Sequence, residues 1–295
     1  MTLNYCYVFY QVALSQNITE AARRMHISQP SVSRSISLLE AELGKKLFIR
    51  SKNGVMFTED GKLFFEYVSK GMKWLNKAEL EIQETDKQGE TITLGVSQLS
   101  IRTILPPILQ EFSSSHPSVN LIIQTASSIN TVDTLSDDLI DVAIVPDPVD
   151  TKPDIETIKL MDISNSLIAG QKYNYLQGRT IKLEELNHYP FIALSQGTAG
   201  RRWLNHLFME NALEISPTIE IPTSDLIVPL AKNNLGLGIV ADIFIQNELS
   251  SGEIIKLSID AELPPRSFIL CYKKNKEQKT AVKDFIALVQ KTCKT

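Results

Sequence analysis

The segment Ser28–Arg34 combines residue types that suit contacts with nucleic acid. Short polar donors at a helix start can reach phosphates and base edges, and an arginine suits guanine or phosphate. The residues predicted to face DNA are Ser28, Gln29, Pro30, Ser31, Ser33 and Arg34. On spacing alone, a generic helical hairpin explains this stretch nearly as well.

Three short helices are predicted to carry this segment. In the first, apolar residues recur every third position at Leu3, Cys6, Phe9 and Val12, and the helix is expected to end near residues 15–17. The second is expected to begin at Thr19, because a threonine hydroxyl can accept an orphan backbone N–H.

The third helix is predicted to start at Ser28, with Pro30 in its first turn, where a missing N–H does no harm. Its apolar positions repeat at intervals of four, three and four, so they bury one face; they are Val32, Ile36, Leu39 and Leu43. Helix geometry then turns Arg34 outward, about 200° from Val32.

A hairpin is predicted after Gly44, which ends the third helix. Its strands are residues 45–50 and 55–57, with a turn between them. Arg50 ends the first strand and Lys52 lies in the turn, and we expect both to contact phosphate without reading sequence.

A long helix is predicted from the N-cap Thr58 to about Asp86, with no proline inside it. It contains an apolar seam with heptad spacing, made of Phe64, Val68, Gly71, Leu75, Ala78 and Ile82. Three heptads with small members favour pairing of this helix in a dimer. The alternative is a helix packed on its own domain.

From Thr91 onward, strands alternate with helices, which predicts an α/β domain with largely parallel strands. The predicted strands are 91–96, 120–124, 142–145, 166–169, 191–193, 218–221, 237–240 and 268–272. The predicted helices are 104–114, 129–135, 201–211, 225–233 and 282–291.

Polar residues that follow the predicted strands are candidates for a ligand cleft: Ser97, Gln98, Ser100, Thr125, Ser195, Gln196 and Thr198. Hydroxyls and free N–H groups at two helix starts favour an anion, and a carboxylate is the first choice. The competing explanation is that each hydroxyl caps its own helix. Arg201 and Arg202 could pair with an acidic ligand, although solvent or an interface is the more usual place for them.

Enzymatic motifs are absent from the sequence. The histidines show no metal-ligand spacing, and there is no G-x-S-x-G, Walker or C-x-x-C motif, so we expect no metal and no cofactor. Gly236–Ala241 spells G-x-G-x-x-A, but a helix pattern precedes it and a strand follows, the reverse of a dinucleotide site. Cys6 and Cys271 are expected in cores and Cys293 near a frayed end, which argues against a thiol sensor.

The residues quoted above resemble the LysR-type transcriptional regulators. The resemblance lies in Ala21-Ala22, Ile27–Ser33, Leu43-Gly44, Leu47-Phe48 and Val55–Gly61, departing at Phe57 and Asp60. It continues more weakly in the remainder of the chain, at Leu94-Gly95, Phe112–Pro117, Leu139–Ile144 and Leu235–Ile239.

The resemblance implies a winged helix-turn-helix at residues 1–58, a dimerising linker helix at 59–88 and a two-lobed domain, like periplasmic binding proteins, at 89–295. Lobe 1 would comprise about 89–162 and 268–295, and lobe 2 about 163–267. The implied partners are double-stranded DNA with an interrupted palindrome, a small effector, a second copy in a homodimer or homotetramer, and RNA polymerase.

Composition agrees with this interpretation. The 295 residues are 43% hydrophobic and carry a net charge of −4, of which residues 1–88 contribute +2 and the remainder −6. With three scattered cysteines and no signal peptide or membrane span, we expect a cytoplasmic protein without a membrane partner. The rival functions are a stand-alone solute-binding or enzymatic α/β protein with a helical extension, and a ligand-independent architectural DNA binder.

Overall fold

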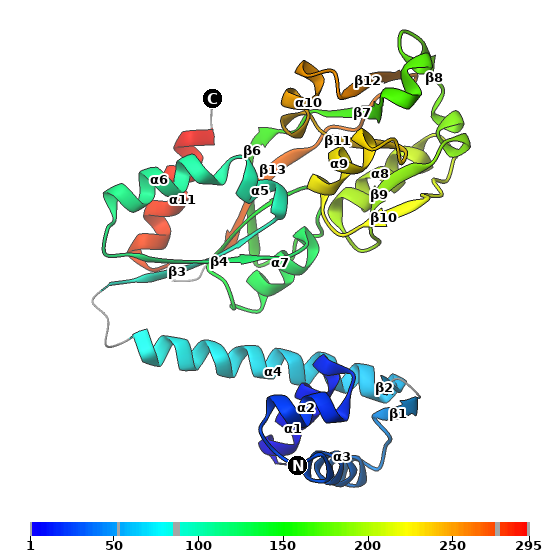
Figure 1. Cartoon of the computed structure of the whole chain (residues 1–295). Helices are drawn as coiled ribbons and strands as arrows, with labels where there is room; N and C mark the ends of the chain where they lie inside the picture. Colours follow the sequence, from blue (N-terminus) through cyan, green and yellow to red (C-terminus); the bar gives the residue numbers. More distant parts are fainter. Residues whose placement is uncertain (1, 52–53, 85–88, 275–277, 294–295) are drawn as a thin grey trace. The chain divides into compact units, whose positions relative to one another are not determined.

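The N-terminal unit consists of four helices and a two-stranded hairpin (Figure 1). The computed structural model describes residues 2–51, 54–84, 89–274 and 278–293, and it divides into the units Met1–Lys87 and Gln88–Thr295. The elements of the first unit are α1 (Leu3–Ser15), α2 (Ile18–Arg24), α3 (Gln29–Leu43), β1 (Phe48–Ser51), β2 (Gly54–Phe57) and α4 (Glu59–Glu84).

The core of this unit forms from the apolar stripes predicted for α1 and α3. Phe9, Val12, Val32 and Leu39 are fully buried there, which confirms the three-and-four spacing. The outermost stripe residues, Leu3 and Leu43, are exposed because each lies in a terminal turn, at the edge of the packed region.

The helix starts follow capping chemistry, with one correction. Asn17, and not Thr19, caps α2, since its Oδ1 accepts hydrogen bonds from the backbone N–H groups of Thr19 and Glu20 at 2.9 and 3.1 Å. Ser28 caps α3 as predicted, and Gly44 ends it in a left-handed conformation with φ 66°.

A buried carboxylate ties α3 to the hairpin. Glu40 Oε1 accepts hydrogen bonds from the backbone N–H groups of Leu47 and Phe48 at 2.9 and 3.3 Å, and Oε2 accepts one from Lys46 Nζ at 2.6 Å. Burial alone would raise the pKa of Glu40, but these three hydrogen bonds outweigh it and hold the pKa below its usual value. The carboxylate therefore fixes the entry of the hairpin relative to the recognition helix.

Helix α4 begins against the same core. Thr58 Oγ1 accepts a hydrogen bond from Gly61 N at 2.9 Å, which confirms the predicted N-cap. A Cβ atom at Gly61 would lie 1.9 Å from the carbonyl oxygen of Leu47, so only glycine permits this approach of helix and hairpin.

The predicted seam on α4 is divided by this packing. Phe64 and Val68 lie in the N-terminal core, and the Phe64 ring centre is 5.0 Å from that of Phe9. At these two positions α4 packs on its own domain, which was the alternative to pairing in a dimer. The correction arises because this face of the helix first crosses the chain's own core. Further along, Gly71, Leu75, Ala78 and Ile82 are exposed.

Two mixed sheets form the second unit, with helices packed on their faces (Figure 1). The first has the strand order β4-β3-β5-β13-β6 and the second β10-β9-β11-β7-β12-β8. Within each sheet three neighbouring strands are parallel, β4, β3 and β5 in one and β10, β9 and β11 in the other. The prediction of largely parallel strands was therefore wrong for β6, β7, β12 and β13, which take part in antiparallel pairs.

We refer to the part of the chain around each sheet as a lobe. Lobe 1 contains β3 (Thr91–Val96), α5 (Gln98–Arg102), α6 (Leu105–Ser115), β4 (Asn120–Thr125), α7 (Ser128–Ser136), β5 (Val142–Pro146), β6 (Ile155–Asp162), β13 (Ser267–Lys273) and α11 (Thr280–Cys293).

Lobe 2 contains six strands, three α-helices and four 3-10 helices. In chain order they are β7 (Asn165–Gly170), η1 (Gln171–Leu176), β8 (Thr180–Ile181), η2 (Leu183–His188), β9 (Phe191–Leu194), α8 (Ala199–Glu210), β10 (Ile219–Ile221), η3 (Ser224–Leu226), α9 (Ile227–Lys232), β11 (Leu237–Ala241), η4 (Asp242–Phe244), α10 (Gln246–Ser250) and β12 (Ile254–Ile259).

All eight strands predicted from Thr91 onward are present. Strands β6, β8 and β12 were missed, as were α5, α10 and the 3-10 helices. Strand β6 was missed because Glu156, Lys159 and Asp162 interrupt its apolar residues, and half of its residues are exposed. The two chain crossings between lobes fall at residues 163–164 and 260–266.

Replacement of Glu40 by glutamine should destabilise the N-terminal unit by about 1.5–3 kcal/mol, because a buried charged acceptor of three hydrogen bonds is removed. Hydrogen exchange of the Leu47 and Phe48 amides should accelerate accordingly. In the wild type, this contribution is fully present above the carboxyl pKa of the unfolded chain and disappears as the pH falls through the lowered pKa of the folded state.

The matched control is Glu66→Gln, which breaks only an exposed ion pair with Lys70 and should change stability by less than about 0.5 kcal/mol. Unchanged exchange at Leu47 and Phe48 in the Glu40 variant would contradict this account of the carboxylate.

Candidate functional site

The first turns of α3 present a polar, exposed surface. Ser28, Gln29 and Ser31 are exposed, and Ser33 is half-buried. The hydroxyls of Ser28 and Ser31 lie 2.7 Å apart, and Gln29 Nε2 donates a hydrogen bond to Ser33 Oγ at 2.9 Å. These side chains hold one another in place on a helix whose opposite face is buried.

Arg34 is exposed one turn further along α3. Within the part of the chain that the structure describes, its guanidinium makes no hydrogen bond or ion pair, unlike Arg23 and Arg24, which both bind Glu20. Arg50 lies in β1 opposite Val55, and Lys52 lies outside the described residues. The structure therefore leaves Arg34 available to an anionic partner.

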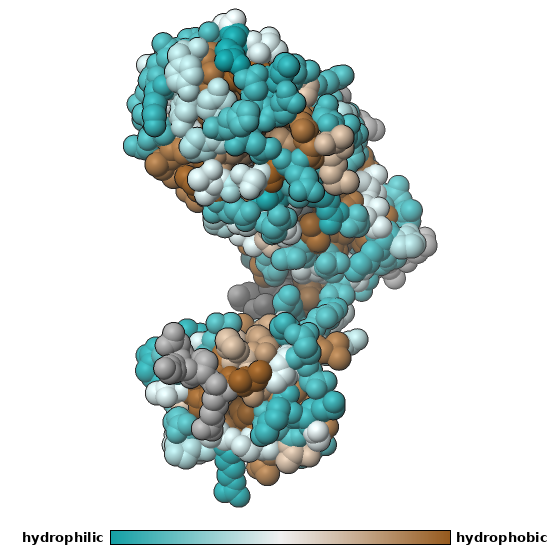
Figure 2. Space-filling view, turned by 90° about the vertical axis from the view of Figure 1, so that its right-hand side faces the viewer, coloured by the Kyte–Doolittle hydropathy of each residue, from teal (hydrophilic) through white to brown (hydrophobic). Residues whose placement is uncertain are grey.

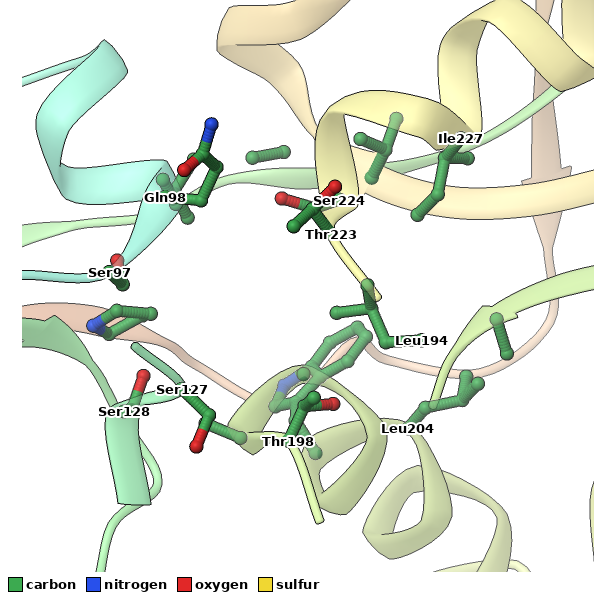
Figure 3. A pocket seen from close by; sticks show the side chains of 18 of the residues that line it. Ser97, Gln98, Ser127, Ser128, Leu194, Thr198, Leu204, Thr223, Ser224 and Ile227 are labelled. Atoms are coloured by element: carbon green, nitrogen blue, oxygen red, sulfur yellow. The ribbon is translucent and has the colours of Figure 1, made fainter. Parts of the chain in front are cut away.

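A cavity of about 290 Å³ lies in the second unit where the two sheets meet (Figure 3). It is bounded by the carboxyl ends of β3, β4 and β5 from lobe 1 and of β9, β10 and β11 from lobe 2. Its position at strand ends is the one that α/β architecture favours for ligands.

The lobe 1 wall is polar. Ser97, Gln98 and Thr125 line the cavity as predicted, together with Ser127 and Ser128 at the start of α7. Ser100 does not line it. That residue is fully buried, and its hydroxyl lies 2.8 Å from Ser97 Oγ, so it supports Ser97 from behind.

The lobe 2 wall is mainly apolar, with Leu194, Leu204 and Ile227 pointing toward the cavity (Figure 3). Thr198 lines it at the N-cap of α8, and Thr223 and Ser224 add hydroxyls that the sequence patterns did not indicate.

Ser195 and Gln196 are not among the lining residues, which corrects the prediction. Ser195 is held in the turn before α8: its backbone N–H donates to Ile221 O at 2.8 Å, and its own carbonyl accepts from Thr198 Oγ1 at 2.9 Å. Gln196 is exposed beside Gly197, whose φ of 79° turns the chain outward.

Neither candidate arginine of α8 faces the cavity. Arg201 is buried and binds Glu220, Asn205 and the carbonyl oxygen of Leu194. Arg202 pairs with Asp150 of lobe 1 at 2.7 Å, and a second pair between lobes joins Arg102 to Asp225 at 3.2 Å. The interface explanation therefore holds for Arg202.

Arg266 and Trp203 also line the cavity, and both were missed. The Arg266 guanidinium lies 5.6 Å from the centre of the Trp203 ring, whose Nε1 donates to Pro264 O at 3.0 Å. No local pattern indicated Arg266, because it precedes a strand in a segment without helical or strand periodicity. Ser127 and Ser128 could have been found by the strand-end rule that selected Ser97.

The described residues were also searched for a metal site and a membrane span. They contain no cluster of His, Cys, Asp or Glu that could hold a metal ion, and no helix among them is long and apolar enough to cross a membrane. Gly236 precedes β11 (Leu237–Ala241), which follows α9, in the helix-then-strand order expected from the sequence. In the turn between α9 and β11, Asn234 has the left-handed conformation. Gly236 is required instead because a Cβ would lie 2.4 Å from Pro190 O.

Comparison with known proteins identifies both units. A family model described as the LysR substrate binding domain matches residues 85–294, and one described as a bacterial regulatory helix-turn-helix protein of the lysR family matches residues 3–62. The chain belongs to the LysR family of transcriptional regulators. This LysR-type regulator binds DNA through its helix-turn-helix and carries an effector-binding domain.

Relatives of this LysR-type regulator include nearly full-length matches and one isolated effector domain. The transcriptional activator IlvY of Haemophilus influenzae is 27% identical over 96% of this chain and 98% of its own. The structure of full-length CbnR complexed with its target DNA shares 20% identity over 99% of this chain and 100% of that chain, with a TM-score of 0.66. The effector domain of QuiR in complex with shikimate shares 21% identity over 70% of this chain and 98% of its own, with a TM-score of 0.62.

The helix-turn-helix match excludes the rival in which residues 1–58 are only an extension of a solute-binding or enzymatic protein. It confirms the resemblance and the winged helix-turn-helix fold expected from the sequence. The boundary between the two described units follows α4 and lies between Lys87 and Gln88.

The cysteines of this LysR-type regulator should be unreactive in the folded state. Cys6, Cys271 and Cys293 are free and buried, so Cys293 is a core residue and not part of a frayed end. Burial raises the pKa of each thiol, that of Cys271 to about 11, which suppresses the reactive thiolate. Alkylation by iodoacetamide at pH 8, followed by mass spectrometry, should be at least about tenfold slower than in the urea-unfolded chain. Rapid labelling of one cysteine in the native protein would contradict this expectation.

Proposed function

We propose that this LysR-type regulator binds an interrupted palindrome as a homodimer, or as a homotetramer of such dimers, and that a small organic anion in the cavity alters its DNA affinity or DNA bending. It would act in the cytoplasm, without catalysis, and would influence transcription through RNA polymerase. The observation that carries the proposal is the exposed, polar start of α3, with the free guanidinium of Arg34, on a helix whose other face is buried.

Reading of sequence is assigned to α3. An exposed helix start can enter the major groove, and Arg34 can then reach base edges, while Ser28, Gln29, Ser31 and Ser33 supply short polar contacts. Pro30 sets the first turn. Arg50, in β1, and Lys52, in the predicted turn, are assigned to phosphate contacts.

Dimerisation is assigned to the exposed apolar stripe of α4. Trp74, Leu75 and Ile82 are 46%, 47% and 72% exposed, although large apolar side chains are usually buried. A contiguous exposed apolar patch of this kind marks an interaction surface. The stripe extends the exposed half of the predicted seam and covers roughly 120° of the helix at about 100° per residue. Its members are Leu63, Tyr67, Gly71, Trp74, Leu75, Ala78 and Ile82.

Hydrophobic residues are also scattered among hydrophilic ones elsewhere on the face shown in Figure 2. The stripe on α4 differs from scattered apolar residues because its members share one side of a single helix. Pairing of two such helices would present two recognition helices to half-sites about 34–36 Å apart, or a multiple of that spacing.

The cavity suits a small organic anion. The N-termini of α7 and α8 meet it at Ser127, Ser128 and Thr198, where backbone N–H groups and helix dipoles favour negative charge. The hydroxyls of Ser97 and Thr125 add donors from lobe 1. The structure of QuiR with shikimate, a related effector domain, supports a ligand of this size class.

An effector can act through the segments that join the lobes. Residues 163–164 and 260–266 are the places where the chain crosses, so rotation there would change the angle between lobes. To shift this equilibrium the ligand must bind one arrangement better, and a tenfold preference corresponds to about 1.4 kcal/mol.

Substitution of Arg34 by alanine should weaken binding to the cognate site by about 1–3 kcal/mol, because the side chain can no longer reach a base edge. Fluorescence anisotropy with cognate and scrambled duplexes would measure the difference, and Arg23→Ala, on α2 and already paired with Glu20, is the matched control. Equal affinity of the folded Arg34 variant and the wild type would show that α3 does not read the sequence.

The double substitution of Arg50 and Lys52 by alanine should behave differently. Removal of cations that neutralise phosphates weakens binding to all sequences alike, and it flattens the dependence of log Kd on log salt concentration by about 0.9 for each phosphate that is no longer neutralised. A full salt slope in this variant would remove both residues from the proposed surface.

Leu75→Asp should disrupt the oligomer, since it would place an unpaired carboxylate in a buried interface. Asn76→Asp is the matched control, because it introduces the same charge at the next, exposed position of α4, away from the stripe. Sedimentation velocity should show a smaller species only for the Leu75 variant. Sedimentation of that variant at the wild-type rate would move the interface elsewhere.

A further inference from the structure

We infer that Arg266 binds the acidic group of the effector, and that the effector is a compact monocarboxylate with an apolar body. The inference deepens the proposed function, because it rests on the cavity being the effector site. It concerns one residue that neither the sequence patterns nor the helix starts indicated.

The first argument is the position of the guanidinium. Arg266 is only 8% exposed, yet it lines the cavity. Its Nε donates a hydrogen bond to the backbone carbonyl of Asp147 at 2.9 Å, while neither Nη group has a hydrogen-bond acceptor in the described part of the chain. A Cβ atom at Gly200 would lie 3.9 Å from Nη2, which puts the guanidinium beside the first turn of α8.

Among the described residues the buried polar atoms without a partner are Thr91 Oγ1 and Asp225 Oδ1, so the unpaired Nη groups of Arg266 are accessible at the cavity wall. Charged groups inside proteins are normally paired, which makes these Nη groups candidates for binding an anion. The negative charge of Asp147 favours the charged form of Arg266. Its side chain, however, accepts a hydrogen bond from Ser267 N and forms no ion pair with Arg266 among the described residues. Burial lowers the pKa of Arg266 to about 10, so the group remains charged at neutral pH. A ligand carboxylate would supply the missing acceptor in a bidentate pair.

The second argument is the charge of the remaining wall. Of the residues that line the cavity, all of which belong to the described chain, Arg266 alone is charged at neutral pH. A ligand with a second acidic group would have to place it against serines, threonines or aliphatic side chains. That desolvation is uncompensated, so the site favours one negative charge and not two.

The third argument is the difference between the walls. Trp203, Leu194 and Leu204 of lobe 2 give the cavity apolar surface, and the Trp203 ring centre lies 5.6 Å from the guanidinium. Ser97 and Gln98 of lobe 1 offer hydrogen bonds. A volume of about 290 Å³ is at the small end of ligand cavities, which span roughly 300–1,000 Å³. The matching ligand is small and carries its apolar part toward lobe 2.

Trp203 provides a direct readout, because the chain has only two tryptophans, and Trp74 lies on α4. In a Trp74→Phe background, fluorescence reports on the cavity alone. We would titrate a panel of compact monocarboxylates, with benzoate as its reference member, against the neutral amides of the same acids and against phthalate as a dicarboxylate.

Saturable quenching is expected for members of the acid panel, with at least tenfold weaker binding of the matched amides and of phthalate. Arg266→Gln should weaken binding of the acids by about 10- to 100-fold and leave the amides unchanged. Arg266→Lys keeps the charge without the planar fork and should be intermediate. Arg179→Gln, an exposed arginine of lobe 2 that binds Glu185, is the matched control and should bind like the wild type.

Three results would overturn the inference: no saturable binding by any acid of the panel, equal binding of acids and amides, or equal binding of the acids by wild type and folded Arg266→Gln. Gel-shift assays of the same proteins with cognate DNA keep the two proposals apart. Absence of acid binding by the wild type, together with intact DNA binding, would refute only the role of Arg266 and the ligand class. Absence of wild-type DNA binding together with Arg266-dependent acid binding would refute the DNA-binding part of the proposed function alone.

Discussion

Hydrogen bonds between the two crossing segments constrain the architecture of the effector-binding unit. Ile163 N donates to the carbonyl oxygen of Arg266 at 2.8 Å, and Ser267 Oγ donates to Asp162 Oδ1 at the same distance. Ser267 N donates to Asp147 Oδ1 at 2.9 Å, which adds the end of β5 to the cluster. Three segments far apart in sequence are joined here, so strand β13 can return to the first sheet after lobe 2 is complete.

The cavity depends on this junction for its shape and its charge. Strand β13 runs antiparallel to β5, so the segment that enters it passes the carboxyl ends of the parallel strands. Arg266 is the last residue of that segment, and its backbone and its Nε take part in the junction. A ligand that binds the guanidinium is therefore in contact with the very segment about which the lobes would rotate, without any intervening relay.

Local rules predicted much of the fold. Apolar spacing located α1, α3 and the eight predicted strands from Thr91 onward, because burial of one face leaves a periodic trace, but it missed β12 despite its apolar residues. Capping preferences identified Ser28 and Thr58 correctly as N-caps. For α2 the N-cap is Asn17 and not Thr19, because several polar residues near a helix start can cap it equally well on sequence grounds.

The effector cavity was harder to predict because its residues come from many segments. Ser97, Gln98, Thr125 and Thr198 follow strands directly, and the strand-end rule found them. Arg266 could not be found in that way: its role follows from which strand β13 pairs with, and that is a property of the tertiary fold. The division of the seam on α4 could not be predicted for a related reason, since periodicity reports an apolar face but not which part of that face the chain's own core covers.

The packing of α4 also determines where this protein can be recombined. Val68 and Met72 belong to the same core as Phe9 and Leu39, and Gly61 touches the hairpin entry. A chimera joined at residue 58 would strip those side chains from the core and leave the recognition helix on an incomplete scaffold. The exchangeable module is the whole stretch through Glu84, so inheritance of a new effector specificity requires that the long helix travel with the DNA-binding elements.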